Sequence, residues 1–260
     1  MKKALFVLLV AIAGISPVAG QANPSAEEIL RKVADTYRSA KKYMFVVQAT
    51  VQTPDLGAPK SFRATYAIEL PDKMRMEGDL TSLGVTRFSG PASFVSDGDA
   101  TWVYNAATKE YYKTVRSSPK GSLGTPEGEY PDLDRPEQIV AYFNQFATAR
   151  LHALLDQTDN LKITGIETIS VEGRAVRCHV IQSDHGDFSH SKAASNRETI
   201  WIEVGRPRIW REDSVTWLQN GLQEHTKTDY MSVLIDEPLP KDLFVFRPPK
   251  DAVLTPIPKD

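Results

Sequence analysis

Alternation of apolar and polar side chains is the feature that most constrains how this chain can fold. In residues 45–51, 62–70 and 73–77, apolar side chains recur at every second position. Successive side chains of a strand point to opposite faces, so each segment predicts a strand with one apolar face. Further segments that we expect to be extended are 83–88, 94–96, 101–104, 111–115, 161–169, 174–183, 198–204, 207–213 and 222–234.

Short polar turns separate these predicted strands. Asp97-Gly98 is a strong two-residue hairpin signal, and Glu172-Gly173 and 205–207 also read as hairpin connections. Two longer polar stretches, 116–133 and 184–196, are expected to be loops. The tail from Pro238 onward is rich in proline, which excludes it from a central strand.

Two segments have helical rather than strand periodicity. The first has Ser25 as its expected N-cap and Glu28 three residues later, and Lys41 and Lys42 are expected to close it. The second is capped by Asp134 and ends near Asp156. Its apolar face consists of Ile139, Phe143, Phe146, Arg150 and Leu154.

These elements predict a mainly β protein. Two meanders of strands, split by a loop and a helix, favour one large curved antiparallel sheet. Its apolar face needs cover, and the two helices are available to supply it. Nothing in composition or charge marks a boundary, so we expect a single domain over residues 23–260.

The first 22 residues have the organisation of a secretory signal peptide. Lys2 and Lys3 precede an apolar run from Ala4 to Ile15, and small residues follow Pro17. The run is about a dozen residues, whereas a membrane span takes about 20. We therefore expect cleavage after residue 20 or 22, no membrane span in the mature chain, and a periplasmic or secreted protein.

Composition excludes some functions and favours none. The formal net charge of −2 provides no basic excess to attract nucleic acid. The single cysteine, Cys178, reads as a buried small hydrophobe, because His179 would point to the opposite face of a strand. Residues 184–190 hold two histidines and two aspartates, which could bind zinc, but polar clusters between strands are usually loops, and we predict a loop here. No sequence motif of a catalytic site or of a cofactor site occurs, so we predict no enzyme activity, cofactor or metal.

Four passages resemble a known family. In chain order they are 26–30 leading into a strand at Tyr43; 95–98 followed by 101–104; 172–178 followed by 199–202 and 208–211; and 235–240 followed by 243–249. Together they are similar to the LolA-like and LolB-like periplasmic lipoprotein carriers and receptors, and to their exported relatives. The chain departs from a standard carrier in its greater length and in the insertion at 116–133.

The resemblance implies a half-open β-barrel with helices as a lid and an apolar cavity for acyl chains. The residues expected to line that cavity are Phe45, Val47, Val51, Phe62, Tyr66, Ile68, Met74, Met76, Ile139, Phe143 and Phe146. The leading hypothesis is a carrier for a lipid or for an acylated lipoprotein. A sensor or adaptor that binds another envelope protein is the alternative, and an envelope hydrolase is the third.

Overall fold

The computed structural model describes residues 24–54, 57–79, 90–115, 161–186 and 193–256. Its one described helix, α1, is Ala26–Ser39. The strands are β1 Lys42–Gln52, β2 Lys60–Glu69, β3 Lys73–Asp79, β4 Pro91–Asp97, β5 Ala100–Asn105, β6 Glu110–Val115, β7 Lys162–Val171, β8 Arg174–Gly186, β9 Ala193–Glu203, β10 Ile209–Leu218, β11 Gln223–Ile235 and β12 Val253–Leu254. The predicted strand at 83–88, the loop at 116–133 and the helix up to Asp156 lie outside the described residues.

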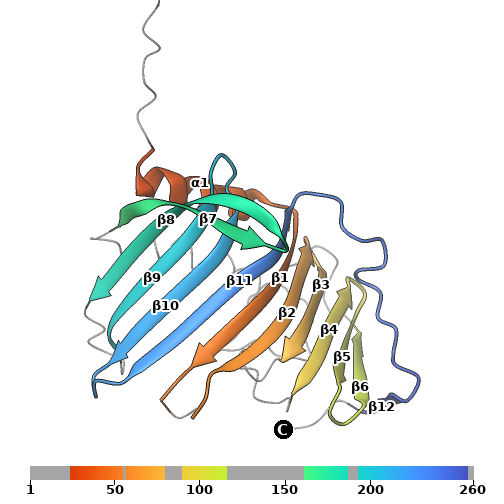
Figure 1. The fold of residues 1–260 in the computed structure, drawn as a ribbon. Helices are drawn as coiled ribbons and strands as arrows, with labels where there is room; N and C mark the ends of the chain where they lie inside the picture. Colours follow the sequence, from red (N-terminus) through yellow and green to blue (C-terminus); the bar gives the residue numbers. More distant parts are fainter. Residues whose placement is uncertain (1–23, 55–56, 80–89, 116–160, 187–192, 257–260) are drawn as a thin grey trace, which may run out of the picture.

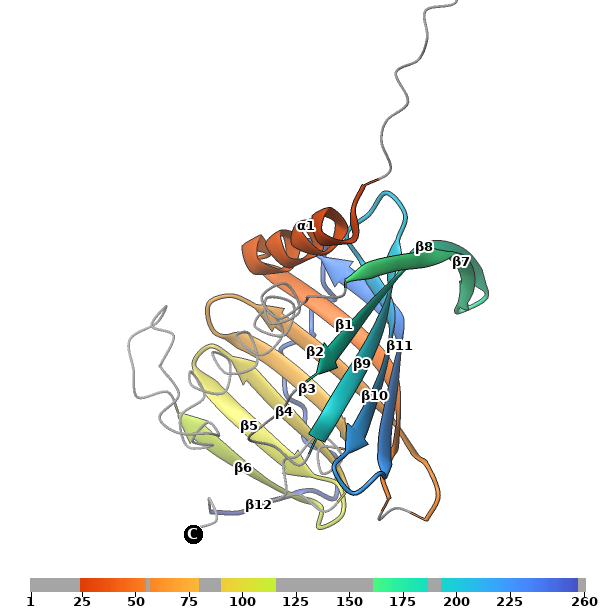
Figure 2. The same ribbon diagram turned by 90° about the vertical axis from the view of Figure 1, so that its left-hand side faces the viewer.

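All described strands belong to one sheet, in the order β12-β6-β5-β4-β3-β2-β1-β11-β10-β9-β8-β7. Two meanders, β1 to β6 and β7 to β11, are joined by the antiparallel pairing of β1 with β11. The short strand β12 is the exception, because it pairs parallel with β6. The sheet curves into an open trough whose two sides are the two meanders (Figures 1 and 2). The predicted mainly β fold is confirmed.

Tight turns form where the sequence predicts them. Ser96 lies opposite Thr101, so Asp97-Gly98 begins the predicted β4–β5 hairpin, and Gly98 adopts a φ of 96°. Val171 lies opposite Arg174, and Glu172 and Gly173 have φ values of 48° and 77°. Two consecutive positive φ angles give the turn a twist that matches the right-handed twist of its strands.

The helix α1 forms as predicted at its start and ends earlier than predicted. The Ser25 Oγ accepts from the Glu28 N–H at 3.1 Å, and the Glu28 carboxylate accepts from the Ser25 N–H at 2.8 Å. The C-cap is Ala40, so the prediction that Lys41 and Lys42 close the helix is wrong. Lys42 instead begins β1, because the chain must already be extended to bring Tyr43 opposite Ile68.

The predicted polar loop at 184–196 is also shorter than expected. Asp184 pairs with Arg197, and the ladder between β8 and β9 continues to Gly186 and Ser195. The polar composition misled the prediction, because these strand ends are partly exposed, as at Asp184, Asn196 and Arg197, and paired strands there need no apolar alternation.

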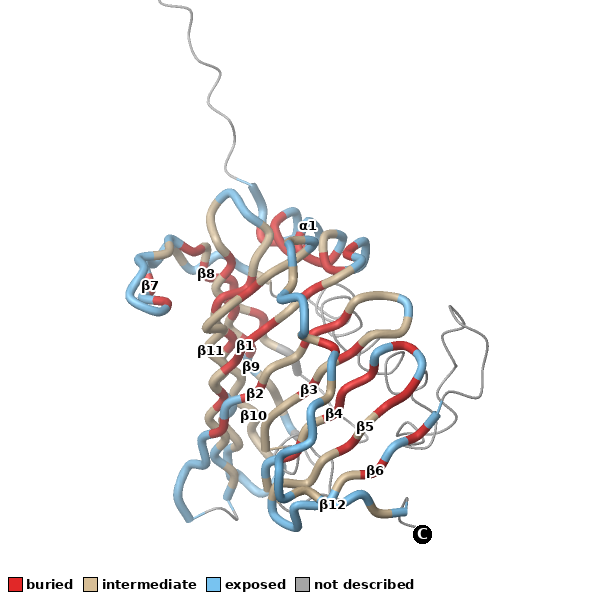
Figure 3. The backbone as a smooth tube through the Cα atoms, turned by 90° about the vertical axis from the view of Figure 1, so that its right-hand side faces the viewer, coloured by how far each residue is buried: buried red, intermediate tan, exposed pale blue. Residues whose placement is uncertain are grey.

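The C-terminal segment, residues 236–255, crosses the sheet on the face opposite to Met74 and Met76. The Arg75 guanidinium donates to the Leu243 carbonyl at 2.9 Å, and Phe246 stacks on Trp102 with ring centroids 6.1 Å apart. The segment ends as β12 beside β6, which can be followed in Figure 3. We call the face under this segment the outer face and the opposite face the inner face.

Candidate functional site

The inner face of the first meander gathers the side chains that the sequence predicted to line a cavity. Eight of the eleven predicted residues are described, and all of them belong to or pack against one apolar cluster. They are Phe45, Val47, Val51, Phe62, Tyr66, Ile68, Met74 and Met76. The other three, Ile139, Phe143 and Phe146, lie outside the described residues.

The strand register explains why these side chains meet. Phe45 lies opposite Tyr66, and Tyr66 lies opposite Met76. Met76 faces Phe94 on β4, which in turn faces Val103 on β5. Because opposite residues in an antiparallel pair share a face, one row of large apolar side chains crosses five strands. Met76 has no exposed surface in this row.

An aromatic group connects this row to the helix. The ring of Tyr37 on α1 stacks on Phe45 at 5.7 Å, and Phe45 also contacts Tyr43 at 5.1 Å. Tyr230 of β11 meets Phe45 edge to face at 5.9 Å. The Tyr37 hydroxyl accepts from the Ile209 N–H at 3.4 Å, which ties the helix to the second meander. Burial raises the pKa of Tyr37 and Tyr43, so both phenols stay neutral at physiological pH.

The inner face of the second meander is more polar. Glu198 on β9 and Glu212 on β10 are buried there, together with Ser183 on β8. Glu198 lies opposite Ser214, and Glu212 lies opposite Ile200, so the two carboxylates occupy diagonal positions. Neither carboxylate was among the residues predicted from the sequence. The sequence did hold a signal for Glu198: it stands two and four residues before the apolar residues Ile200 and Ile202, and alternate residues of a strand lie on the same face.

Two buried threonines extend the inner face of the first meander toward its edge. Thr101 on β5 lies directly opposite Thr114 on β6. Thr101 also lies opposite Ser96, which lies opposite Met74. The sequence predicted strands at these positions but gave these hydroxyls no role.

Cys178 fits the predicted structural role. Its thiol is free and buried, and burial raises its pKa to about 11. Glu203 raises it further, whereas Arg211 acts in the opposite direction. A thiol with a raised pKa is protonated at neutral pH, so Cys178 is not activated as a nucleophile.

The histidine-containing stretch is described only in part. The Asp184 carboxylate accepts from the Arg197 guanidinium at 2.7 Å, and Lys162 lies 3.5 Å from it. Residues 187–190 lie outside the described part of the chain. Among the described residues, no group of three or more His, Cys, Asp or Glu side chains is placed to hold a metal ion.

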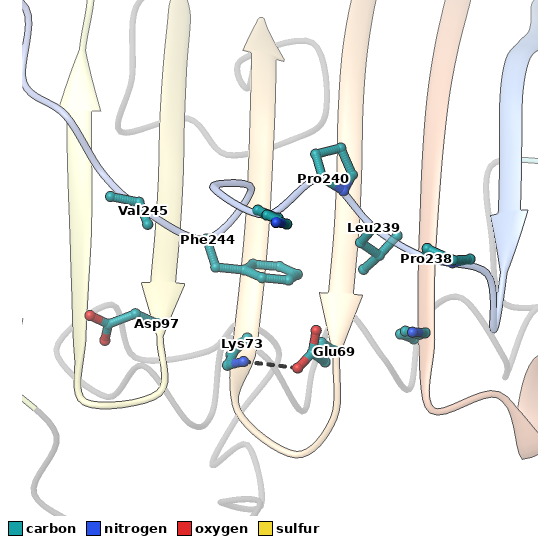
Figure 4. A pocket seen from close by; sticks show the side chains of 10 residues that line it. Glu69, Lys73, Asp97, Pro238, Leu239, Pro240, Phe244 and Val245 are labelled. Carbon is teal, nitrogen blue, oxygen red and sulfur yellow. Dashed lines mark hydrogen bonds and ion pairs between the residues drawn. The ribbon is translucent and has the colours of Figure 1, made fainter.

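A groove of about 410 Å³ lies between the outer face and the C-terminal segment (Figure 4). Phe244 fills its middle, and the Lys73 ammonium there pairs with Glu69 at 2.8 Å. This groove lies on the opposite side of the sheet from the apolar row. Its charged lining does not suit an acyl chain, so we place the candidate site on the inner face.

The fold and this face define a class of protein: a single curved, unclosed antiparallel sheet that carries a helix on an apolar inner face. The chain belongs to the family described as "Predicted periplasmic protein (DUF2092)", whose model matches residues 26–257. The periplasmic location predicted from the sequence is confirmed by this family. In the part of the chain that is described, no helix has the length and apolar character needed to cross a membrane.

Several solved structures are similar to this chain at low identity. Lipoprotein LppX of Mycobacterium tuberculosis is 14% identical, with 84% of this chain and 99% of LppX covered and a TM-score of 0.45. LprF of Mycobacterium bovis is 12% identical, covering 88% of this chain and 97% of LprF, with a TM-score of 0.45. A LolA superfamily protein of Nitrosomonas europaea is 13% identical, covering 86% and 99%, with a TM-score of 0.29.

The single open antiparallel sheet that the resemblance implied is the architecture observed. No curated protein matches the chain in sequence.

Proposed function

We propose that this protein is a non-enzymatic periplasmic carrier that holds a lipid, or the acylated end of a lipoprotein, against the inner face of its sheet. The observation that supports the proposal is the apolar row from Phe45 to Val103, which crosses five strands on the face that α1 overlies. Each methylene removed from water contributes about 0.8 kcal/mol, so a dozen would give about 10 kcal/mol before the costs of binding.

The contacts of α1 suit such a cover. Its buried residues are Ala26, Ile29, Leu30, Val33, Ala34 and Tyr37. Apolar contacts have no strict direction, so an acyl chain can replace those that the helix makes. Uptake would then require α1, or part of it, to move away from the inner face.

Native mass spectrometry of the protein purified from the periplasm tests the proposal. We expect a fraction of molecules to carry the mass of an acyl lipid, and the delipidated protein to take up a fluorescent fatty acid. Protein that has no bound lipid and takes up no fatty acid would refute the carrier function.

Two matched variants locate the uptake. Ile68→Glu places a charge on the inner face, where Ile68 is buried, whereas Ile166→Glu places the same charge on β7, where the side chain is 50% exposed. We expect only Ile68→Glu to abolish uptake. Circular dichroism melting of both variants accompanies the assay, because an unpaired charge in a tightly packed core would unfold the protein instead.

The adaptor function has one observation of its own. Among the described strands β7 is the last of the sheet, and Ile163 and Ile166 on it are exposed. An unpaired edge strand with apolar side chains can accept a strand from another protein. A pull-down from the periplasm that depends on Ile166, with no lipid bound to the purified protein, would favour this function over the carrier.

A further inference from the structure

Thr101 and Thr114 carry buried hydroxyl groups on neighbouring strands of the inner face. Their side chains are 3% and 8% exposed, and the Oγ1 atom of neither has a hydrogen-bond partner within the part of the chain that the structure describes. The two residues lie directly opposite each other on β5 and β6. Side chains in such a pair are about 5 Å apart at Cβ, so the two hydroxyls act at one place.

Their neighbour in the same row shows what a satisfied hydroxyl looks like here. Ser96, opposite Thr101, donates from its Oγ to the Asp72 carbonyl at 3.0 Å and accepts from the Gly98 N–H at 3.4 Å. Buried polar groups are nearly always paired, and valine has the shape of threonine without the cost of an unpaired hydroxyl. Two threonines side by side, without a hydrogen-bond partner among the described residues, therefore point to a partner from elsewhere.

The position of the pair identifies the chemistry of that partner. Ile68 and Met74 continue the row of Ser96, Thr101 and Thr114 on the apolar side. The next inner-face residues along the same strands are Val103 and Tyr112, which are buried and belong to the apolar cluster. A ligand that lies on the apolar row and reaches the threonines must be apolar along its length and carry hydrogen-bond acceptors at one end.

We propose that Thr101 and Thr114 donate hydrogen bonds to the ester carbonyls of a diacylglyceryl group whose chains lie on the inner face. This inference rests on the proposed carrier function and specifies its ligand as an acyl ester. A phospholipid and the diacylglyceryl cysteine of a lipoprotein share this chemistry, and both present two ester carbonyls close together.

The test compares ester and ether lipids, because an ether has the same chains but lacks the carbonyl acceptor. Binding of dipalmitoyl phosphatidylglycerol, its dihexadecyl ether analogue and a dipalmitoylglyceryl-cysteine peptide is measured by displacement of a fluorescent fatty acid. We expect the wild-type protein to prefer the ester to the ether about tenfold, since a net hydrogen bond is worth up to about that factor. The relative affinities of phospholipid and lipopeptide then distinguish the two sources.

The variants are Thr101→Val/Thr114→Val and, as the matched control, Thr101→Ser/Thr114→Ser. We expect the valine variant to lose the preference for the ester while still binding the ether, and the serine variant to keep it. We also expect the valine variant to melt at or above the temperature of the wild type, because it removes two unpaired buried hydroxyls.

Each outcome separates this inference from the carrier function. Wild-type protein that binds ester and ether equally would refute the role of the threonines and leave the carrier function in place. A valine variant that is clearly less stable than the wild type would show that the hydroxyls have partners within the protein, and the inference would be wrong. Wild-type protein that binds none of the three ligands would overturn the inference together with the carrier function.

Discussion

Replacing Phe45 by alanine tests the packing of α1 on the sheet more sharply than any other single change. The Phe45 ring stacks on Tyr37 of the helix, on Tyr43 of its own strand, and meets Tyr230 of β11 edge to face. Phe45→Ala therefore loosens the contact between the helix and both meanders at once.

The expected cost follows from burial and ring geometry. Phe45 is buried, and truncating a buried phenylalanine to alanine costs about 3–5 kcal/mol of unfolding free energy. Part of this belongs to the aromatic pairs, each worth about 0.5–1.5 kcal/mol beyond the buried area. Phe45→Leu keeps most of the apolar volume and loses the ring pairs, so we expect it to cost about 1–2 kcal/mol.

Urea unfolding followed by far-ultraviolet circular dichroism measures both costs. A domain is typically stable by about 5–15 kcal/mol, so Phe45→Ala should lower the midpoint markedly while leaving the slope of the transition unchanged. A loss below about 1 kcal/mol for Phe45→Ala would show that the ring is not packed between α1 and β11. A Phe45→Leu variant as stable as the wild type would show that the aromatic pairs contribute nothing.

Three further predictions concern the rest of the molecule. Burial raises the pKa of the Cys178 thiol to about 11, so a thiol reagent should label the native protein at pH 8 roughly two-hundredfold more slowly than the unfolded chain, whose thiol has a pKa near 8.5. The pKa of the Cys178 thiol is higher in the folded than in the unfolded chain, so the folded state is favoured fully below the unfolded pKa and progressively less as the pH rises toward 11. The urea midpoint, measured at increasing alkaline pH, should fall accordingly. The hydrogen bond from Arg197 lowers the pKa of the Asp184 carboxyl. The stabilisation that this ion pair gives the folded state is therefore present above the unfolded pKa of the carboxyl and is lost as the pH falls. Both partners are substantially exposed, so Asp184→Asn should cost less than about 1 kcal/mol in urea unfolding at pH 7, and a larger cost would contradict this reading. Phe246→Ala should free the C-terminal segment from Trp102, seen as faster tryptic cleavage at Lys250 and a shift in tryptophan emission, and unchanged cleavage would mean that the stack does not hold the segment.

Local alternation predicted most of the first meander correctly because its inner face is buried and regular. Phe62, Ile68, Met74 and Met76 all occupy the face that their spacing predicted. Alternation fixes which side chains share a face, since a one-residue shift would turn the whole set outward. It says nothing of partners distant in sequence, so the pairing of β1 with β11 could not be read from the chain.

The polar features of the site were harder to predict. From the sequence, Glu198 and Glu212 look like ordinary solvent-facing residues of a strand, yet both are buried in the structure. Thr101 and Thr114 have high strand propensity, so their presence in β5 and β6 needed no further explanation at the sequence level. Only the register brings the two hydroxyls together, and only their burial makes it informative that the described residues offer them no hydrogen-bond partner.

The outer face of the first meander explains why a ligand would use the inner one. Ala67 and Val95 point to the outer side and have no exposed surface, and the C-terminal segment is fastened beside them through Arg75 and Phe246. Those contacts combine a directed hydrogen bond with stacked rings, which an acyl chain cannot replace. The helix α1 also has a ring stack and a hydrogen bond, both through Tyr37, but its other buried residues are aliphatic, and an acyl chain can replace aliphatic contacts at small net cost. A ligand should therefore displace α1 more easily than the C-terminal segment, and we expect it to reach the apolar row from the side of α1.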